Sequence, residues 1–147
     1  MLISPSVLNS NLGRLSEEIS KVEGVADLIH LDVMDNHFVP NLSFGLPVVA
    51  GVIAQTSLPV DVHLMIDDPD RWAPAYGEAG AYSVTFHIEA AKDPLTLSKN
   101  ISATGARVAA ALKPGTDLDS LDGLIEHLDM ILIMTVEPGF GGQAFMY

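Results

Sequence analysis

The chain has 147 residues, 48% of them hydrophobic, and this length and composition are typical of one folded globular domain. It contains no cysteine, which excludes disulfides, thiolate metal sites and cysteine nucleophiles and fits a reducing compartment. A net charge of −12 argues against a nucleic-acid partner, and no stretch has the pattern of a signal peptide or a membrane span.

Short apolar runs and helical apolar spacing alternate along the chain. The runs predict six strands, at 2–8, 27–34, 59–65, 81–88, 106–112 and 129–136. Five helices are predicted between them, beginning after residues 9–11, at Pro47, and behind Asp68, Asp93 and Asp117. Such alternation implies parallel strands joined by helical crossovers. Because no linker or shift in composition divides the chain, we expect residues 1–147 to form a single domain.

Two α/β architectures are compatible with this alternation, an open doubly wound sheet and a (β/α)8 TIM barrel. A nucleotide-binding doubly wound sheet needs Gly-x-Gly-x-x-Gly after its first strand, where this chain has Asn-Ser-Asn-Leu-Gly. The strands at 27–34, 59–65 and 81–88 also share a polar face, as strands that gather at a barrel mouth do. A whole barrel has eight strands and about 250 residues. We therefore expect an incomplete barrel that is truncated at its C-terminal side, just past strand six.

The strand at 27–34 carries the most unusual polar face. Side chains alternate along a strand, so His30, Asp32 and Met34 share one face. The Cβ atoms of His30 and Asp32 should lie about 7 Å apart. One metal ion could lie between an imidazole and a carboxylate at that spacing. A lone histidine on such a face is more often a hydrogen-bonded structural residue, so the pair alone leaves both interpretations open.

Six motifs carry a resemblance to a known family. They are Ser-Pro-Ser-Val-Leu at 4–8, His-Leu-Asp-Val-Met-Asp-Asn-His-Phe-Val-Pro-Asn at 30–41, Asp-Val-His-Leu-Met at 61–65, Phe-His-Ile-Glu-Ala at 86–90, Lys-Pro-Gly-Thr at 113–116 and Met-Thr-Val-Glu-Pro-Gly-Phe-Gly-Gly-Gln at 134–143. In this order and spacing the chain resembles the ribulose-phosphate 3-epimerase family, whose fold is a (β/α)8 barrel of the ribulose-phosphate-binding type. Asn36 stands where the family has glycine, and both residue types tolerate a positive φ.

The resemblance implies one divalent metal ion, bound by two histidines and two aspartates. It assigns three of these ligands to His30, Asp32 and His63. The strand geometry agrees, since His63 would point to the same side from a neighbouring strand about 4.8 Å away. Two imidazoles and a carboxylate suit Zn²⁺, Fe²⁺, Mn²⁺ or Co²⁺.

The activity that the resemblance implies is epimerisation at carbon 3 of D-ribulose 5-phosphate to D-xylulose 5-phosphate, a step of pentose phosphate metabolism. Asp32 would be one of two acid/base groups on either side of an enediolate. The second, an Asp on strand seven, and the phosphate loops after strands seven and eight are not in this chain. Two alternatives stay open, a catalytically incompetent metal-binding fragment and a 3-epimerase for a hexulose 6-phosphate such as allulose 6-phosphate.

Further candidates would contact the substrate. Ser6 would bind it or, equally well, bond to nearby backbone. The glycine-rich loop offers amides for the phosphate, and three methionines end strands on the polar face, as a soft lining or as plain core. The candidates are Ser6, Met34, His63, Met65, Met134, Gly139, Phe140, Gly141 and Gly142.

Six residues have weaker assignments. We expect Asp35 to act in a turn or behind the site, and His87 and Glu89 to support the site or to be plain core. Lys113 should contact phosphate or solvent. His37 and His127 should lie on the surface. The partner is predicted to be a small ketose phosphate, with no nucleic acid or membrane, in a cytoplasmic protein that is a homo-oligomer at full length. Because the net charge repels an anion, a metal or backbone amides must attract it.

Overall fold

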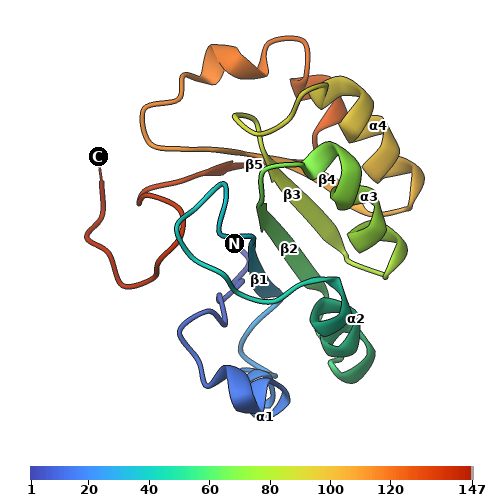
Figure 1. Ribbon diagram of the computed structural model, residues 1–147. Helices are drawn as coiled ribbons and strands as arrows, with labels where there is room; N and C mark the ends of the chain where they lie inside the picture. The colour runs from blue at the N-terminus through green and yellow to red at the C-terminus, as the bar shows by residue number, and fades with distance from the viewer. Residues whose placement is uncertain (147) are drawn as a thin grey trace.

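A parallel sheet of five strands forms the centre of the protein (Figure 1). The computed structural model describes residues 1–146. The strands lie in the order of the chain: β1 (Ile29–Met34), β2 (Val60–Met65), β3 (Ser83–His87), β4 (Arg107–Leu112) and β5 (Met130–Ile133). An order that never reverses is expected for a barrel wall, whereas a doubly wound sheet reverses at its switch point. The predicted α/β fold of an incomplete barrel is therefore confirmed.

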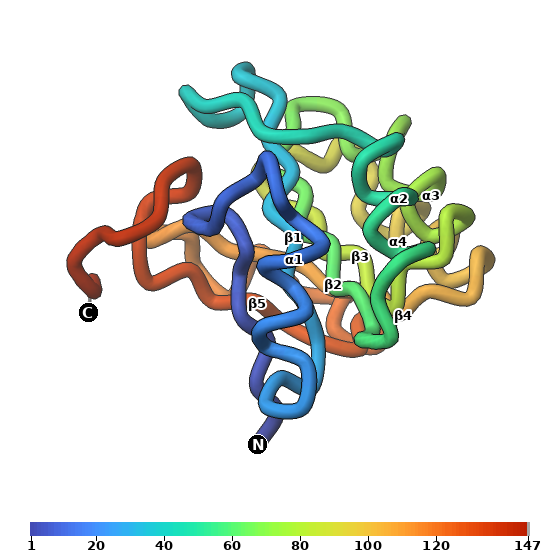
Figure 2. The backbone as a smooth tube through the Cα atoms, turned by 90° about the horizontal axis from the view of Figure 1, so that it is seen from below, coloured from blue at the N-terminus to red at the C-terminus, as the bar shows by residue number. Residues whose placement is uncertain are grey.

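Within residues 1–146, α1 (Leu15–Ser20) precedes β1, and three further α-helices connect successive strands from β1 to β4: α2 (Leu46–Gln55), α3 (Pro69–Glu78) and α4 (Pro94–Ala103). Both views place α2, α3 and α4 on one side of the sheet and the segment after β5 on the other (Figures 1 and 2). Each of these three helices has proline in its first turn, where the missing N–H has no intrahelical partner to lose. None of the helices within residues 1–146 combines the length and apolar character needed to cross a membrane.

The main hydrophobic core lies between the sheet and these helices. It is built from the apolar residues that alternate along the strands, such as Ile29, Leu31, Val62 and Phe86, all fully buried. The opposite face of the same strands carries the polar residues. This division follows from the two-residue period of a strand, and it directs every inward side chain toward the side free of helices.

The predicted strand at 2–8 is wrong as a regular strand. Only Ser6 forms a bridge, to His30 of β1, although the carbonyls of Ile3 and Pro5 accept hydrogen bonds from the backbone near β1. The pairing stops at Val7, whose carbonyl accepts from the backbone N–H and the hydroxyl of Ser10. Proline also has no N–H to contribute, so the segment follows β1 without completing a ladder.

The fifth predicted helix, after Asp117, is also wrong. The segment forms two short 3₁₀ helices, Leu118–Leu121 and Ile125–His127. Gly123 lies between them with a φ of +73°, which a right-handed helix cannot contain. A third 3₁₀ turn, Leu12–Arg14, precedes α1.

Candidate metal centre

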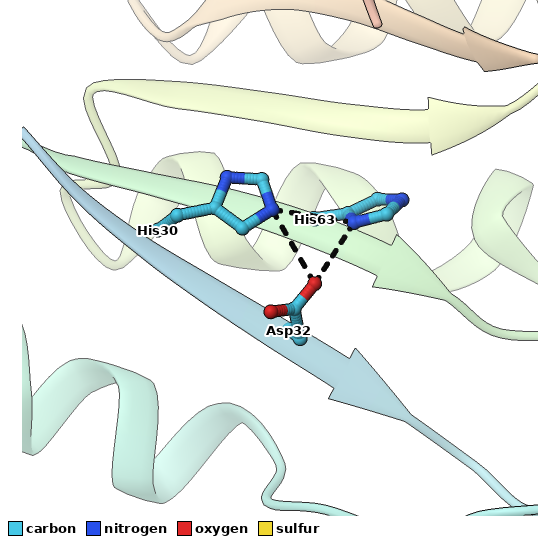
Figure 3. A group of neighbouring side chains, drawn as sticks. All are labelled: His30, Asp32 and His63. Atoms are coloured by element: carbon cyan, nitrogen blue, oxygen red, sulfur yellow. Dashed lines mark hydrogen bonds and ion pairs between the residues drawn. The ribbon is translucent and has the colours of Figure 1, made fainter. Parts of the chain in front are cut away.

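Strand register brings the predicted ligands together. Asp32 of β1 lies directly opposite His63 of β2, and His30 precedes Asp32 by two residues on the same face. Figure 3 shows the three side chains converging from the two strands. The Nε2 atom of His30 lies 3.3 Å from Asp32 Oδ1 and 3.3 Å from His63 Nδ1, and the last two atoms are 3.0 Å apart. The three donor atoms therefore form a nearly equilateral triangle.

This triangle has the dimensions of one face of a metal coordination shell. Ligands about 2.0–2.1 Å from a cation are separated by about 3.4 Å in a tetrahedral shell, and by about 3.0 Å in an octahedral one. The observed sides of 3.0–3.3 Å lie between these values. His30, Asp32 and His63 could thus hold one divalent ion, and the spacing does not distinguish Zn²⁺ from Fe²⁺, Mn²⁺ or Co²⁺.

The two histidines lie in opposite electrostatic environments. Burial opposes a charge on His30, but hydrogen bonds and charge interactions with Asp32 and Asp61 outweigh it and raise the pKa of His30 to about 10. His63 is completely buried, and burial together with the nearby imidazoles His30 and His87 lowers its pKa to about 4 despite the contact with Asp32. In the metal-free protein at neutral pH, His30 is therefore an imidazolium and His63 is neutral.

The carboxylate of Asp32 contacts both histidines. Burial would raise the pKa of this carboxyl, but hydrogen bonds with His30 and His63 hold it far below its usual range. One carboxylate oxygen, Oδ1, faces both rings, and the other, Oδ2, accepts a hydrogen bond from the hydroxyl of Ser6. The carboxylate is consequently ionised and fixed in orientation from both sides.

At each histidine, the ring nitrogen that does not belong to the donor triangle contacts the first of two further polar residues. Behind His30, its Nδ1 atom is 2.7 Å from Asp61 Oδ2, and the hydroxyl of Ser83 donates to Asp61 Oδ1 at 2.5 Å. Behind His63, its Nε2 atom is 2.9 Å from His87 Nε2, and His87 Nδ1 is 3.1 Å from Glu89 Oε2. Burial opposes ionisation of Glu89, but its hydrogen bonds lower its pKa to about 2.

The triangle lines a cavity of about 350 Å³ on the side of the sheet away from the helices. Every residue predicted to contact the substrate also lines it: Ser6, Met34, His63, Met65, Met134, Gly139, Phe140, Gly141 and Gly142. Met34 and Met65 are almost fully buried against Val39, so they pack a small apolar cluster and border the cavity as well. A cation and a small polar ligand could therefore occupy one continuous space.

The chain matches known proteins along nearly its whole length. The model of the ribulose-phosphate 3 epimerase family matches residues 2–147. The chain belongs to this family. Proteins named ribulose-phosphate 3-epimerase from Mycobacterium tuberculosis and Bacillus subtilis are 54% and 43% identical to it, over 99% of this chain and 63% and 67% of their own lengths. That from Mycobacterium leprae is 53% identical, over 99% of this chain and 64% of its own length. The chain thus spans somewhat less than two thirds of the mycobacterial relatives.

In this epimerase-family chain, the turn after β1 contacts the glycine-rich loop that lines the cavity. The turn after β1 contains Asn36, whose φ of +58° is the conformation expected where the family has glycine. Asp35 accepts hydrogen bonds inside this turn and from the backbone of Asp67, so it acts in loop structure. The amide of Asn41 donates to the carbonyl of Gly139 at 2.8 Å. The turn and the glycine-rich loop are therefore joined directly.

The glycine-rich loop is closely packed where it lines the cavity. Gly139 and Gly142 have φ of +124° and +73°, which favour glycine. A Cβ atom on Gly141 would lie 2.3 Å from the side-chain nitrogen of Asn9. Asn9 also lines the cavity, and our sequence analysis gave it no role.

The remaining candidates of this epimerase-family chain divide between the site and the surface. His87 is fully buried behind His63, whereas His37 and His127 are exposed. Lys113 places its ammonium 3.8 Å from the centre of the Phe38 ring. The sequence analysis assigned no function to Asp61, which lies in β2 opposite His30. Its signal was present, two residues before His63 on the same face.

Proposed function

We propose that this protein is a metal-dependent epimerase that interconverts D-ribulose 5-phosphate and D-xylulose 5-phosphate by inverting carbon 3. The observation that carries the proposal is the triangle of donor atoms from His30, Asp32 and His63 beside a cavity. Membership of the epimerase family and the names of the relatives support it. Residues 1–147 would form part of one barrel domain, and the activity is proposed for the protein at its natural length.

Inverting a carbon next to a ketone requires removal of a proton from one face and its return on the other. A divalent ion held by His30, Asp32 and His63 would stabilise the negative charge of the enediolate formed in between. We assign the proton exchange to Asp32, and its position supports this, because Oδ1 faces the histidines while Oδ2 lies beside Ser6 at the cavity. The resemblance supplies the opposite face with a second Asp, which is not in this chain.

Binding a phosphate ester requires local attraction, because the net charge of the chain is −12. The glycine-rich loop lines the same cavity as the metal ligands, and glycine lets backbone amides approach an anion closely. We assign Gly139, Gly141 and Gly142 to this contact and Phe140 to the wall. Met34, Met65 and Met134 would line the apolar part of the space over the reacting carbons.

The finer assignments belong to the same proposal. Zn²⁺, Fe²⁺, Mn²⁺ and Co²⁺ all suit the donor set. We propose a pentulose phosphate over a hexulose phosphate because that is the substrate the relatives' names contain. A cytoplasmic homo-oligomer is the expected form, and gel filtration with light scattering measures the oligomeric state.

The experiment is deuterium exchange at carbon 3 of ribulose 5-phosphate in heavy water, with the protein at its natural length. We expect exchange to stop after treatment with a chelator and to return when Zn²⁺, Fe²⁺, Mn²⁺ or Co²⁺ is added. Undiminished exchange in the chelated protein would refute the metal dependence. Comparing kcat/KM for ribulose 5-phosphate and allulose 6-phosphate decides the substrate, and a higher value for the hexulose would refute the pentulose assignment.

A further inference from the structure

The contacts behind His63 form a continuous row that ends at Glu89. Asp32 Oδ1 is 3.0 Å from His63 Nδ1, His63 Nε2 is 2.9 Å from His87 Nε2, and His87 Nδ1 is 3.1 Å from Glu89 Oε2. His63 and His87 are both almost fully buried, and their rings stack with centroids 5.0 Å apart. The row thus contains three contacts, and two imidazoles are the only possible donors in it.

Two neutral imidazoles cannot satisfy all three contacts. Each neutral ring carries one N–H, so two protons must be shared among three positions. In one arrangement the protons lie on His63 Nδ1 and His87 Nε2, which leaves the lone pair of His87 Nδ1 facing the carboxylate of Glu89. In a second they lie on His63 Nε2 and His87 Nδ1. In a third they lie on His63 Nδ1 and His87 Nδ1, which leaves the lone pairs of the two Nε2 atoms facing each other at 2.9 Å. Only the second arrangement leaves the lone pair of His63 Nδ1 free for a metal.

The surroundings of Glu89 favour the second arrangement. Its Oε1 atom accepts the backbone N–H of Lys113 at 2.7 Å and the hydroxyl of Thr116 at 2.6 Å. These contacts fix the carboxylate so that Oε2 faces His87. An ionised carboxylate only accepts hydrogen bonds, so Glu89 stabilises a proton on His87 Nδ1. The second arrangement is the one that does so while also placing an N–H in the 2.9 Å contact between His63 and His87.

We propose that Glu89 is a positioning residue, acting through His87 to hold His63 in the tautomer whose Nδ1 lone pair can bind the metal. The inference rests on the proposed metal site and adds a role for two residues that do not belong to the donor triangle. It also links the loop at 113–116 to the metal centre through His87, because the carboxylate of Glu89 contacts both the loop and His87. Hydrogen bonding of the second ring nitrogen is a general means of fixing a metal-binding histidine.

The variant Glu89→Gln tests the proposal with little change in shape. Glutamine has one acceptor oxygen, which the two donors of Lys113 and Thr116 would retain. Its NH2 group would then face His87 Nδ1 and move the protons to His87 Nε2 and His63 Nδ1, the ligand atom. We expect the affinity for Co²⁺ alone to fall about 10- to 100-fold, measured from the visible absorption of the bound ion in competition with a chelator.

A matched control and a double variant separate this role from a purely structural one. Glu126→Gln makes the same chemical change at an exposed site and should leave the Co²⁺ affinity within about twofold. In a His87→Gln background, Glu89→Gln should have little additional effect, because the residue that transmits it is gone. An undiminished loss of affinity from Glu89→Gln in the His87→Gln background would overturn the proposal.

A measurement on the unaltered protein decides the matter even if Glu89→Gln fails to fold. Nitrogen-15 spectra of the Zn²⁺-loaded protein should show protons on His63 Nε2 and His87 Nδ1. A proton on His87 Nε2 would overturn the proposal, as would Co²⁺ affinity in Glu89→Gln within about twofold of the unaltered protein. His63→Ala should lose the metal altogether. Metal binding that survives His63→Ala would instead refute the metal site of the proposed function.

Discussion

The two histidines of the metal centre contact the same carboxylate but are supported in different ways. On one side, His30 contacts a second carboxylate, Asp61, at 2.7 Å, and its pKa is raised to about 10. On the other side, His63 contacts a second imidazole, His87, and its pKa is lowered to about 4. The β1 side therefore attracts a positive charge, whereas the β2–β3 side repels one.

This contrast indicates how the empty site can orient both histidine ligands while holding an extra proton on only one of them. If both histidines contacted two carboxylates, both would be imidazolium ions, and a cation would have to displace two protons. If neither did, both rings could stay neutral, and the buried charge of Asp32 would face no opposite charge in the empty site. The interposed His87 orients His63 without charging it, so a cation displaces a proton from His30 alone.

The largest effect should come from Asp32, which both sides share. We expect Asp32→Asn to reduce turnover by at least about 10³-fold, because a proton-transfer group and an anionic ligand are lost together. Co²⁺ affinity should fall as well. Steady-state kinetics and Co²⁺ titration measure the two effects, and His127→Gln at the exposed surface should change neither. Retained turnover in Asp32→Asn would show that the carboxylate does not transfer the proton. The residue that both histidines contact would then have no part in the reaction.

Much of this centre could be predicted from two-residue alternation alone. Alternation places His30 and Asp32 on one face, and the same period in the next strand gives His63. The pairing of His30 with Asp61 could not be predicted in this way. It depends on the register that sets Ile29 against Val60, and parallel strands have no short turn to fix their register.

The errors in the fold have equally local causes. The segment at 2–8 has the composition of a strand, but the N–H and hydroxyl of Ser10 compete for the carbonyl of Val7. Apolar spacing after Asp117 fits a helix, but Gly123 adopts a positive φ in its middle. In both places one residue outweighs a regular pattern, and average propensities do not contain that information.

A pH titration of metal binding would sharpen the contrast between the two histidines. Because the pKa of His30 is raised to about 10, this ring is protonated at neutral pH and must lose one proton to the solvent when a cation binds. Affinity should therefore increase about tenfold per pH unit, or about 100-fold between pH 7 and pH 9, and level off above about 10. His63 contributes no proton in this range because its pKa is about 4. Calorimetry in buffers of different ionisation enthalpy counts the protons released, and a value of two or zero would contradict the assignment.

Removal of the charge behind His30 should have a smaller effect. Asp61→Asn keeps a carbonyl that can accept the Nδ1–H of His30, so the tautomer is preserved while the charge is lost. We expect Co²⁺ affinity at pH 9 to fall about tenfold, at the lower end of the effect of removing a metal ligand's partner. The pKa of His30 should also fall, which would flatten the pH dependence toward pH 9. An unchanged pH profile in Asp61→Asn would mean that Asp32 alone holds the proton on His30.

The smallest effect should come from Ser83, which contacts Asp61 but not the histidine. Its hydroxyl donates to Asp61 Oδ1 at 2.5 Å in a buried position, so Ser83→Ala should destabilise the fold by about 1.5–3 kcal/mol, measured by urea unfolding. Co²⁺ affinity should change only a few-fold, because the charge beside His30 remains. In an Asp61→Asn background, this change in affinity should largely disappear, since the hydroxyl acts through that carboxylate. If Ser83→Ala weakened Co²⁺ binding as much as Asp61→Asn does, rigid placement of Asp61 rather than its charge would prepare His30. The two histidines would then be supported by the same means.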